Sequence, residues 1–389
     1  MPPYLAGRLA ETREFSKLLT QNPILQNVVL TGLRGVGKTV LMDTFKPLAL
    51  KHGWLWVGTD LSESTSISED NLVTRLLTDL AVVTGSLRLN AGEAKTFGFG
   101  ATRDRKHVAL DYHALKAIYD HTPGLVADKL KKMLELAWQI LLEREEKLPG
   151  LIFAYDEAQN MGDHVEKDQY PLSLLLDVFQ SLQRKGVRFM LVLTGLPTLF
   201  PKLVEARTFA ERMFRIIFLR QLSDIDSREA VLQPIRDAQC PVKLDKRSVD
   251  TIVRVSGGYP YFIQFVCREV YDVFLQNLSR GEPASVPVED IHRKLDNDFF
   301  VGRWARATDR QRELLVVIAY LDADDEEFTV QEIVEMARAR LKKPFSASHV
   351  SQMLVSLANS GLIFKNRYGK YSFAVPLLRA FIRRQIKQP

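Results

Sequence analysis

The stretch VVLTGLRGVGKTVLM, residues 28–42, runs from an apolar segment through three glycines to a lysine and a threonine. Glycine inside regular structure costs roughly 0.5–1 kcal/mol relative to alanine, so three glycines within six positions need a physical reason. The spacing Gly32-x-x-x-x-Gly37-Lys38-Thr39 is the pattern of a phosphate-binding loop (P-loop) between a strand and a helix. In such a loop, backbone N–H groups point at a phosphate near the positive end of the helix. We therefore expect this stretch to bind the phosphates of a nucleotide.

The pattern assigns a role to its side chains. Lys38 would reach the β- and γ-phosphates, and the Thr39 hydroxyl would bind Mg²⁺. The expected nucleotide-binding residues of this stretch are Gly32, Leu33, Arg34, Gly35, Val36, Gly37, Lys38, Thr39 and Val40.

Two acidic residues follow the apolar run LIFAY, residues 151–155. Asp156 would hold Mg²⁺ through water, and Glu157 would polarise the water that attacks the γ-phosphate. A kinase of small molecules needs no base for water, so the acidic pair favours hydrolysis. Thr194, at the end of the apolar run 187–194, would bind the γ-phosphate or position the water.

Three arginines, Arg207, Arg212 and Arg215, lie in or beside the segment TFAERMF, residues 208–214. An arginine at this place can reach a nucleotide that a neighbouring subunit holds. The alternative for each is a solvated arginine on a helix surface.

Five apolar runs of strand length alternate with helical patterns, at residues 27–31, 53–62, 151–155, 187–194 and 215–222. This alternation predicts an α/β fold, a doubly wound parallel sheet with helices on both faces. Ligands of such sheets bind at the carboxyl ends of the strands, where the glycine loop, Asp156-Glu157 and Thr194 all fall.

The order of patterns along the chain predicts three domains. The nucleotide-binding core covers residues 1–221 with an inserted excursion at 85–124, and a helical lid covers 222–301. Residues 302–389 read as three helices followed by the hairpin FKNRYGKYSF, residues 364–373, which is the order of a winged helix-turn-helix domain.

Bulk composition excludes several classes of protein. At 389 residues with 46% hydrophobic and 26% charged residues, the chain has the composition of a multidomain globular protein. No apolar run reaches the roughly 18 residues of a membrane span, and the N-terminus lacks the pattern of an export signal. The two cysteines, Cys240 and Cys267, have no zinc-site or disulfide-framework spacing. We expect a cytoplasmic protein with no membrane partner.

The motifs together resemble a known family. The order P-loop, DEAQ (156–159), LTGLP (193–197), ERMFR (211–215) and SGGYP (256–260) is similar to AAA+ ATPases. The closest resemblance is to the branch of replication-initiator, origin-recognition and transposition-regulator ATPases, and Gly258-x-Pro260 resembles the lid of STAND signalling ATPases.

This resemblance implies ATP as the nucleotide and an ATP-dependent homo-oligomer. It implies that Gly7 and Arg8, in AGRLAETREF, lie near the adenine and that Pro260 on the lid contacts the nucleotide. It also implies that Thr194 is the sensor-1 residue and Arg212 the arginine finger.

Charge and the C-terminal domain point to a polyanionic partner. The net charge is +6, and residues 302–389 carry the whole excess, with 15 Lys and Arg against 9 Asp and Glu. The predicted recognition helix, 346–358, has no Lys or Arg, so contacts with double-stranded DNA phosphates would come from Lys365, Arg367 and Lys370 of the hairpin and from the basic tail. Two interpretations remain open. The protein is an ATPase that assembles on DNA and regulates or loads a partner protein, or a STAND-type switch whose winged helix contacts protein.

Overall fold

The computed structural model describes residues 4–90, 107–144, 147–240, 242–281, 286–321, 327–366 and 369–387. Contacts along the chain group it into two compact units. One unit comprises Leu9–Thr31 and Lys38–Phe218, and the other comprises Met1–Arg8, Gly32–Gly37 and Leu219–Pro389. The glycine loop, Gly32–Gly37, therefore belongs to the same unit as the C-terminal half of the chain. The boundaries of the three predicted domains stay predictions.

A five-stranded sheet in the order β2-β5-β6-β1-β7 carries the expected fold class. Its strands are β1 (Asn27–Gly32), β2 (Leu55–Val57), β5 (Leu151–Tyr155), β6 (Phe189–Gly195) and β7 (Phe214–Leu219). The pairs β2–β5, β5–β6 and β6–β1 are parallel. Every residue of β1, β5 and β6 is buried, which is why these strands are continuous apolar runs in the sequence. The α/β prediction with a parallel sheet is confirmed.

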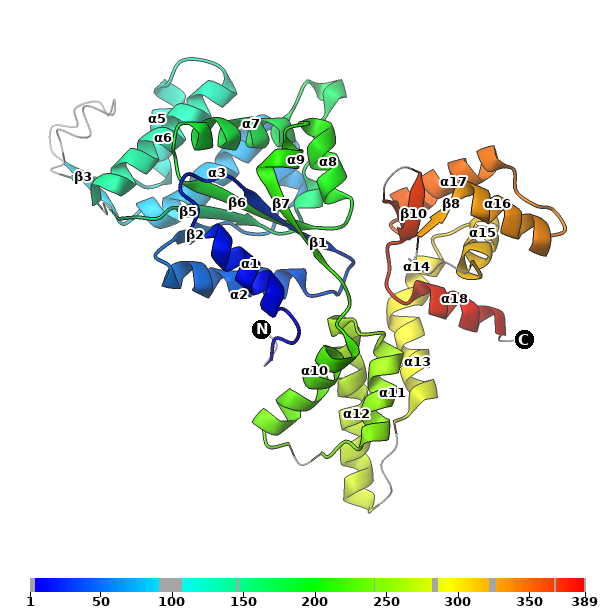
Figure 1. The fold of residues 1–389 in the computed structure, drawn as a ribbon. Coiled ribbons are helices and arrows are strands. Elements are labelled where there is room, and N and C mark those ends of the chain that lie inside the picture. The colour runs from blue at the N-terminus through cyan, green and yellow to red at the C-terminus, as the bar shows by residue number, and fades with distance from the viewer. Residues whose placement is uncertain are drawn as a thin grey trace. The chain divides into compact units, whose positions relative to one another are not determined.

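Helices cover both faces of this sheet (Figure 1). One face carries α1 (Leu9–Leu18) and α2 (Lys38–Lys51), and the other carries α3 (Glu69–Thr84), α6 (Val126–Arg144) and α7 (Pro171–Arg184). Two short helices, α8 (Leu199–Ala206) and α9 (Ala210–Met213), precede the edge strand β7. Their apolar sides form one core cluster with the buried strands.

Part of the inserted excursion is a hairpin followed by a helix. β3 (Arg88–Asn90) pairs antiparallel with β4 (His107–Ala109), and α5 (Tyr112–His121) follows. Residues 91–106, between the two strands, lie outside the described residues. Asp111 caps α5 by accepting the N–H of Ala114 at 3.0 Å.

Helices make up the part of the second unit that the sequence predicts as a lid. They are α10 (Asp224–Asp237), α11 (Lys246–Ser256), α12 (Pro260–Arg280) and α13 (Val288–Leu295), followed by a π-helix (Asp296–Val301) and the one-turn α14 (Gly302–Trp304). The sequence predicted the helices, whereas nothing in its periodicity indicated the π-helix.

The C-terminal segment holds α15 (Asp309–Ala319), α16 (Val330–Arg340), α17 (Ala347–Asn359) and α18 (Leu378–Lys387). A three-stranded antiparallel sheet in the order β8-β10-β9 accompanies them, formed by β8 (Glu327–Thr329), β9 (Ile363–Lys365) and β10 (Lys370–Phe373). The predicted hairpin is present. β8 was not predicted, because a three-residue strand is defined by its pairing with β10 and not by its own pattern.

Candidate functional site

Asp156 is the centre of the predicted site. It follows β5, is 3% exposed, and its Oδ2 accepts a hydrogen bond from the Thr39 hydroxyl at 2.5 Å. Its Oδ1 accepts hydrogen bonds from the Thr194 hydroxyl and from the backbone N–H of Glu157, the latter at 2.7 Å. The contact between Asp156 and Thr194 follows from the parallel pairing of Tyr155 with Leu193, because Asp156 and Thr194 are the next residues along the two paired strands. The structure thus brings Thr39, Asp156 and Thr194 together.

This cluster has the composition of a magnesium site. Hydroxyl and carboxylate oxygens are the ligands that Mg²⁺ prefers, and Mg²⁺ usually keeps several waters beside one or two protein ligands. The Thr39 hydroxyl and the Asp156 carboxylate fit this description. Thr194 bonds to Asp156, so its proposed contact with the γ-phosphate requires its hydroxyl to be released or shared.

Lys38 lies at the first position of α2 and is 9% exposed. The first turn of α2 contains no acidic residue, so its positive end has no negative side chain of its own. A helix N-terminus with a lysine and without an acid attracts phosphate. The position of Lys38 therefore agrees with the role that the P-loop pattern gives it.

The loop residues Gly32–Gly37 pack within the second unit. Gly35 has φ +76°, and a Cβ there would lie 2.8 Å from Cβ of Tyr261, so only glycine fits. The N–H of Tyr261 donates to the carbonyl of Gly35 at 3.1 Å, which joins the loop to the start of α12. Pro260, the predicted lid contact, opens that helix.

Arg8 contacts the loop backbone. It is 6% exposed, and its guanidinium donates to the carbonyls of Val36 at 3.0 Å and Arg220 at 2.8 Å. Gly7 has φ +62° and lies against Asp226 of α10. The contacts of Arg8 hold the shape of the loop, and the predicted proximity of Gly7 and Arg8 to an adenine stays a prediction.

Glu157 is exposed and has left-handed backbone angles, φ 51° and ψ 33°. The Gln159 amide donates to its carboxylate, and the Gln159 carbonyl oxygen accepts the backbone N–H of Leu196 at 3.0 Å. Gln159 thus connects the proposed base, after β5, to the loop after β6. Sequence reasoning missed this role, although Gln159 lies in the quoted DEAQ segment.

The three arginines near β7 differ in their partners. Arg207 makes two hydrogen bonds to the carboxylate of Asp177, at 2.9 and 2.7 Å, and this pairing raises the pKa of Arg207. Arg215 pairs with Glu14 of α1. Arg212, exposed on α9, makes no ion pair or side-chain hydrogen bond with any residue that the structure describes.

The basic residues of the hairpin are only partly available. Lys365 is exposed, whereas Lys370 pairs with Glu327 of β8 at 3.2 Å, and Arg367 lies outside the described residues. In the tail, Arg384 pairs with Asp296, and Arg383 donates to the carbonyl of Ala319 at 2.7 Å.

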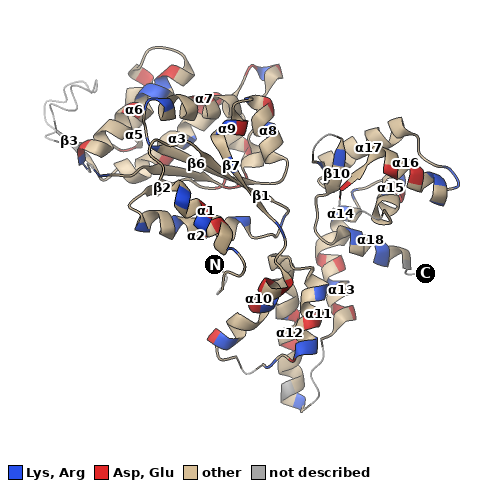
Figure 2. Ribbon diagram, in the orientation of Figure 1, with Lys and Arg blue, Asp and Glu red and all other residues tan. Residues whose placement is uncertain are grey.

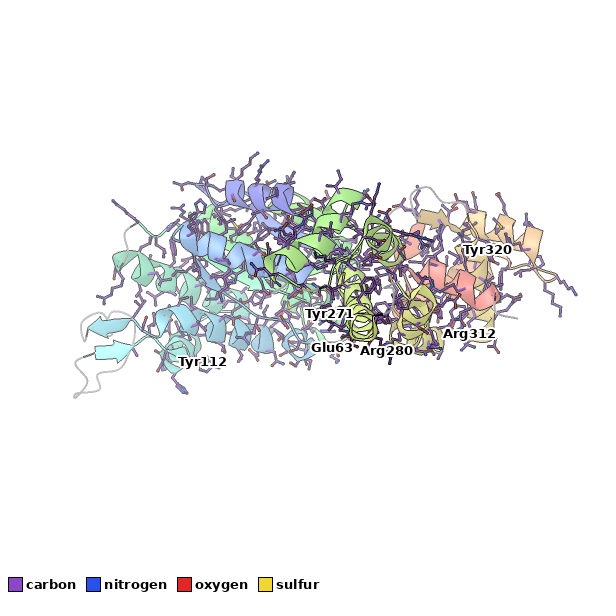
Figure 3. The ribbon with its side chains drawn as sticks, turned by 90° about the horizontal axis from the view of Figure 1, so that it is seen from below. Glu63, Tyr112, Tyr271, Arg280, Arg312 and Tyr320 are labelled. Carbon is purple, nitrogen blue, oxygen red and sulfur yellow. The ribbon has the colours of Figure 1, made fainter. Side chains whose placement is uncertain are left out.

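The cations of α18 stand out on the ribbon in Figure 2. Arg383 also lies over the ring of Tyr320, a residue labelled in Figure 3, at 5.5 Å from the ring centroid. The tail arginines that we expected to anchor DNA phosphates therefore hold α18 in place.

Solved structures with the same fold cover nearly the whole chain. The Walker-type ATPase of Pyrococcus abyssi is 16% identical with a TM-score of 0.58, over 97% of this chain and 96% of that one. The ADP form of the Aeropyrum pernix ORC2 protein is 16% identical with a TM-score of 0.53, over 100% and 95%. The structure of its ADPNP-ADP complexes is 14% identical in sequence with a TM-score of 0.52, over 100% of this chain and 97% of that one. The chain thus has the fold of these ATPases.

Sequence comparisons add one domain. Residues 297–382 match a domain of unknown function (DUF8462). No curated protein matches the chain. Among the described residues, no helix has both the length and the apolar character that a membrane span requires.

Proposed function

We propose that the protein is an AAA+ ATPase that binds ATP with Mg²⁺, hydrolyses it, and assembles on DNA as a nucleotide-dependent regulator or loader of a partner protein. The observation that carries the ATPase proposal is the hydrogen bond from Thr39 to Asp156, which joins residues 117 apart in the sequence. It brings the expected magnesium ligand of the P-loop to the acidic end of β5. The fold shared with a Walker-type ATPase and with ADP-bound ORC2 supports the same function.

Each residue then has a task in hydrolysis. Lys38 and the N-terminus of α2 neutralise the phosphate charge, while Thr39 and Asp156 hold Mg²⁺. When bound, Mg²⁺ supplies charge neutralisation between the phosphate oxygens. Glu157 accepts the proton of the attacking water, Gln159 orients the carboxylate of Glu157, and Thr194 orients Asp156. Arg212 is available to a nucleotide on a neighbouring subunit.

Two substitutions test the ATPase proposal. Lys38→Ala removes the cation at the start of α2, so binding of a fluorescent ATP analogue should fall at least about 100-fold. Glu157→Gln keeps the size of the side chain but not its basicity, so ATP should still bind while steady-state phosphate release falls by about 10²–10⁴-fold. Tight ATP binding by Lys38→Ala, or undiminished turnover by Glu157→Gln, would contradict these assignments.

A second function has its own supporting observation. The C-terminal segment is tied to the lid, because Arg384 of α18 pairs with Asp296 and a Cβ at Gly257 would lie 2.7 Å from Leu377. A cavity of about 320 Å³ separates Leu33 of the loop and Tyr259 of the lid from residues 373–383. This arrangement supports a STAND-type switch in which the nucleotide state controls how tightly the winged helix is held, and the winged helix contacts protein.

A further inference from the structure

Three arginines of the second unit gather without an acidic partner. Arg34 of the glycine loop and Arg306 after α14 are exposed, and Arg303 of α14 is half-buried. None of the ion pairs in the described part of the chain includes any of the three, although Asp298 is nearby in sequence. Burial and the neighbouring positive charges of Arg34 and Arg306 lower the pKa of Arg303. The cluster is therefore an uncompensated positive surface.

Aromatic rings lie within the same surface. Tyr261, the second residue of α12, is 46% exposed, and its ring centroid is 5.6 Å from that of Phe299 in the π-helix. The guanidinium of Arg303 lies over the Phe299 ring at 4.1 Å. π-helical turns are rare and occur often at functional sites, and this one gives Phe299 its place between Tyr261 and Arg303.

Backbone contacts fix this surface to the P-loop. The carbonyl of Gly35, next to Arg34, accepts the N–H of Tyr261, and the tight approach at Gly35 allows no side chain there. The N–H of Arg306 donates to the carbonyl of Arg303 at 3.2 Å, so these two arginines share one turn. Cations and an exposed ring are thus held together by ordered backbone and not by a flexible tail.

We propose that Arg34, Tyr261, Arg303 and Arg306 form a binding surface for single-stranded nucleic acid. The arginines bind backbone phosphates, and the exposed face of Tyr261 stacks on an unpaired base. A cationic surface with an aromatic ring is the arrangement by which proteins hold single strands, whereas the base faces of a duplex are already stacked. This contact is additional to the duplex contact that the sequence predicts for the C-terminal hairpin, and it does not depend on ATP hydrolysis.

The test is fluorescence anisotropy of labelled oligo-dT with the full chain, as a function of salt. Arg303→Ala with Arg306→Ala should weaken binding at least about tenfold and reduce the slope of log affinity against log salt by about 1.4, or roughly 0.7 for each lost phosphate contact. Tyr261→Leu should weaken binding about tenfold through lost stacking. Because Arg306 is exposed, Arg306→Ala alone supplies a variant that leaves the packing intact, with a smaller loss in the same direction.

Matched controls lie on the same helix. Tyr271 and Arg280 of α12 are exposed and labelled in Figure 3, and Tyr271→Leu and Arg280→Ala should leave the affinity for oligo-dT unchanged. Unchanged affinity of the Arg303/Arg306 double variant, or an equal loss in the controls, overturns the proposal. A loss confined to duplex of matched length, or to a fluorescent ATP analogue, also overturns it. Failure of the Lys38→Ala test leaves these outcomes unaffected, so the two proposals fail separately.

Discussion

At the residue scale, the three arginines near β7 differ in their ion-pair partners, and this difference decides which of them can act as an arginine finger. Arg207 and Arg215 have carboxylate partners in their own chain, in Asp177 and Glu14. Moving either arginine toward a neighbouring subunit would cost that pairing. Arg212 is exposed and has no ion pair with a described residue to lose, which makes it the best placed of the three to act on a nucleotide that a neighbouring subunit holds.

We predict that Arg212→Ala keeps ATP binding but lowers hydrolysis in the assembled state by roughly 10³-fold, the usual range for a lost arginine finger. Steady-state phosphate release should be measured across a range of protein concentrations, because an arginine acting in trans matters only where subunits meet. Arg215→Ala is the control and should change turnover little. Equal turnover of the Arg212→Ala and wild-type proteins at high concentration would remove Arg212 from the mechanism.

At the scale of elements, the ends of β5 and β6 are joined by one amide. Gln159 donates to Glu157 after β5 and accepts the N–H of Leu196 after β6. The backbone carbonyl of Gln159 accepts a hydrogen bond from the ammonium group of Lys202 of α8 at 2.9 Å. Since the proposed base is exposed and in a left-handed turn, this amide is what limits the freedom of the Glu157 carboxylate.

We predict that Gln159→Leu lowers kcat for ATP hydrolysis about tenfold and leaves KM and ATP affinity nearly unchanged, because the base is present but less well oriented. Gln159→Glu should lower kcat as well, because the new carboxylate repels the carboxylate of Glu157 and cannot donate a hydrogen bond to it. Gln233→Leu on α10, which removes an amide bonded to Asp237, is a control without expected effect. A rise in KM with constant kcat would show that Gln159 serves binding instead.

At the scale of the whole molecule, the proposed functions differ in what drives assembly. A DNA-assembled ATPase needs nucleotide and DNA together, because the interface includes a bound nucleotide and the DNA raises the local concentration of subunits. A STAND-type switch needs ATP alone, because the nucleotide frees surfaces that the closed lid and winged helix cover.

We predict that Glu157→Gln protein, which should bind ATP without consuming it, grows in mass by light scattering only with ATP and a mixed-sequence duplex present. Growth with ATP alone, indifferent to DNA, would favour the signalling switch. The matching ADP samples, in which the γ-phosphate is missing, should stay at the mass of the starting species in either case.

The sequence alone determined the fold class and the place of the glycine loop between β1 and α2, because both follow from local patterns. Continuous apolar runs specify strands buried on both faces, such as β5 and β6, whatever the rest of the chain does. The glycines of the loop recur at the spacing of a known pattern, so the sequence indicates them, whereas the close approach of Tyr261 to Gly35 emerges only from the fold. Asp156 and Glu157 follow β5, and Thr194 lies at the end of β6. Because these strands are parallel, their carboxyl ends lie at the same edge of the sheet, so the sequence also placed these side chains near one another.

Only the tertiary structure decided which of these side chains meet and which cations remain available. Thr39 and Asp156 are 117 residues apart, and Gln159 and Leu196 are 37 apart, so no periodicity indicates their contact. Tail arginines that read as phosphate anchors are held by Asp296 and by helix carbonyls, whereas Arg34, Arg303 and Arg306 stay unpaired by any described acid. The physical reason is that charge and hydrogen-bonding capacity are properties of a residue, but their satisfaction depends on neighbours that packing brings from distant parts of the chain.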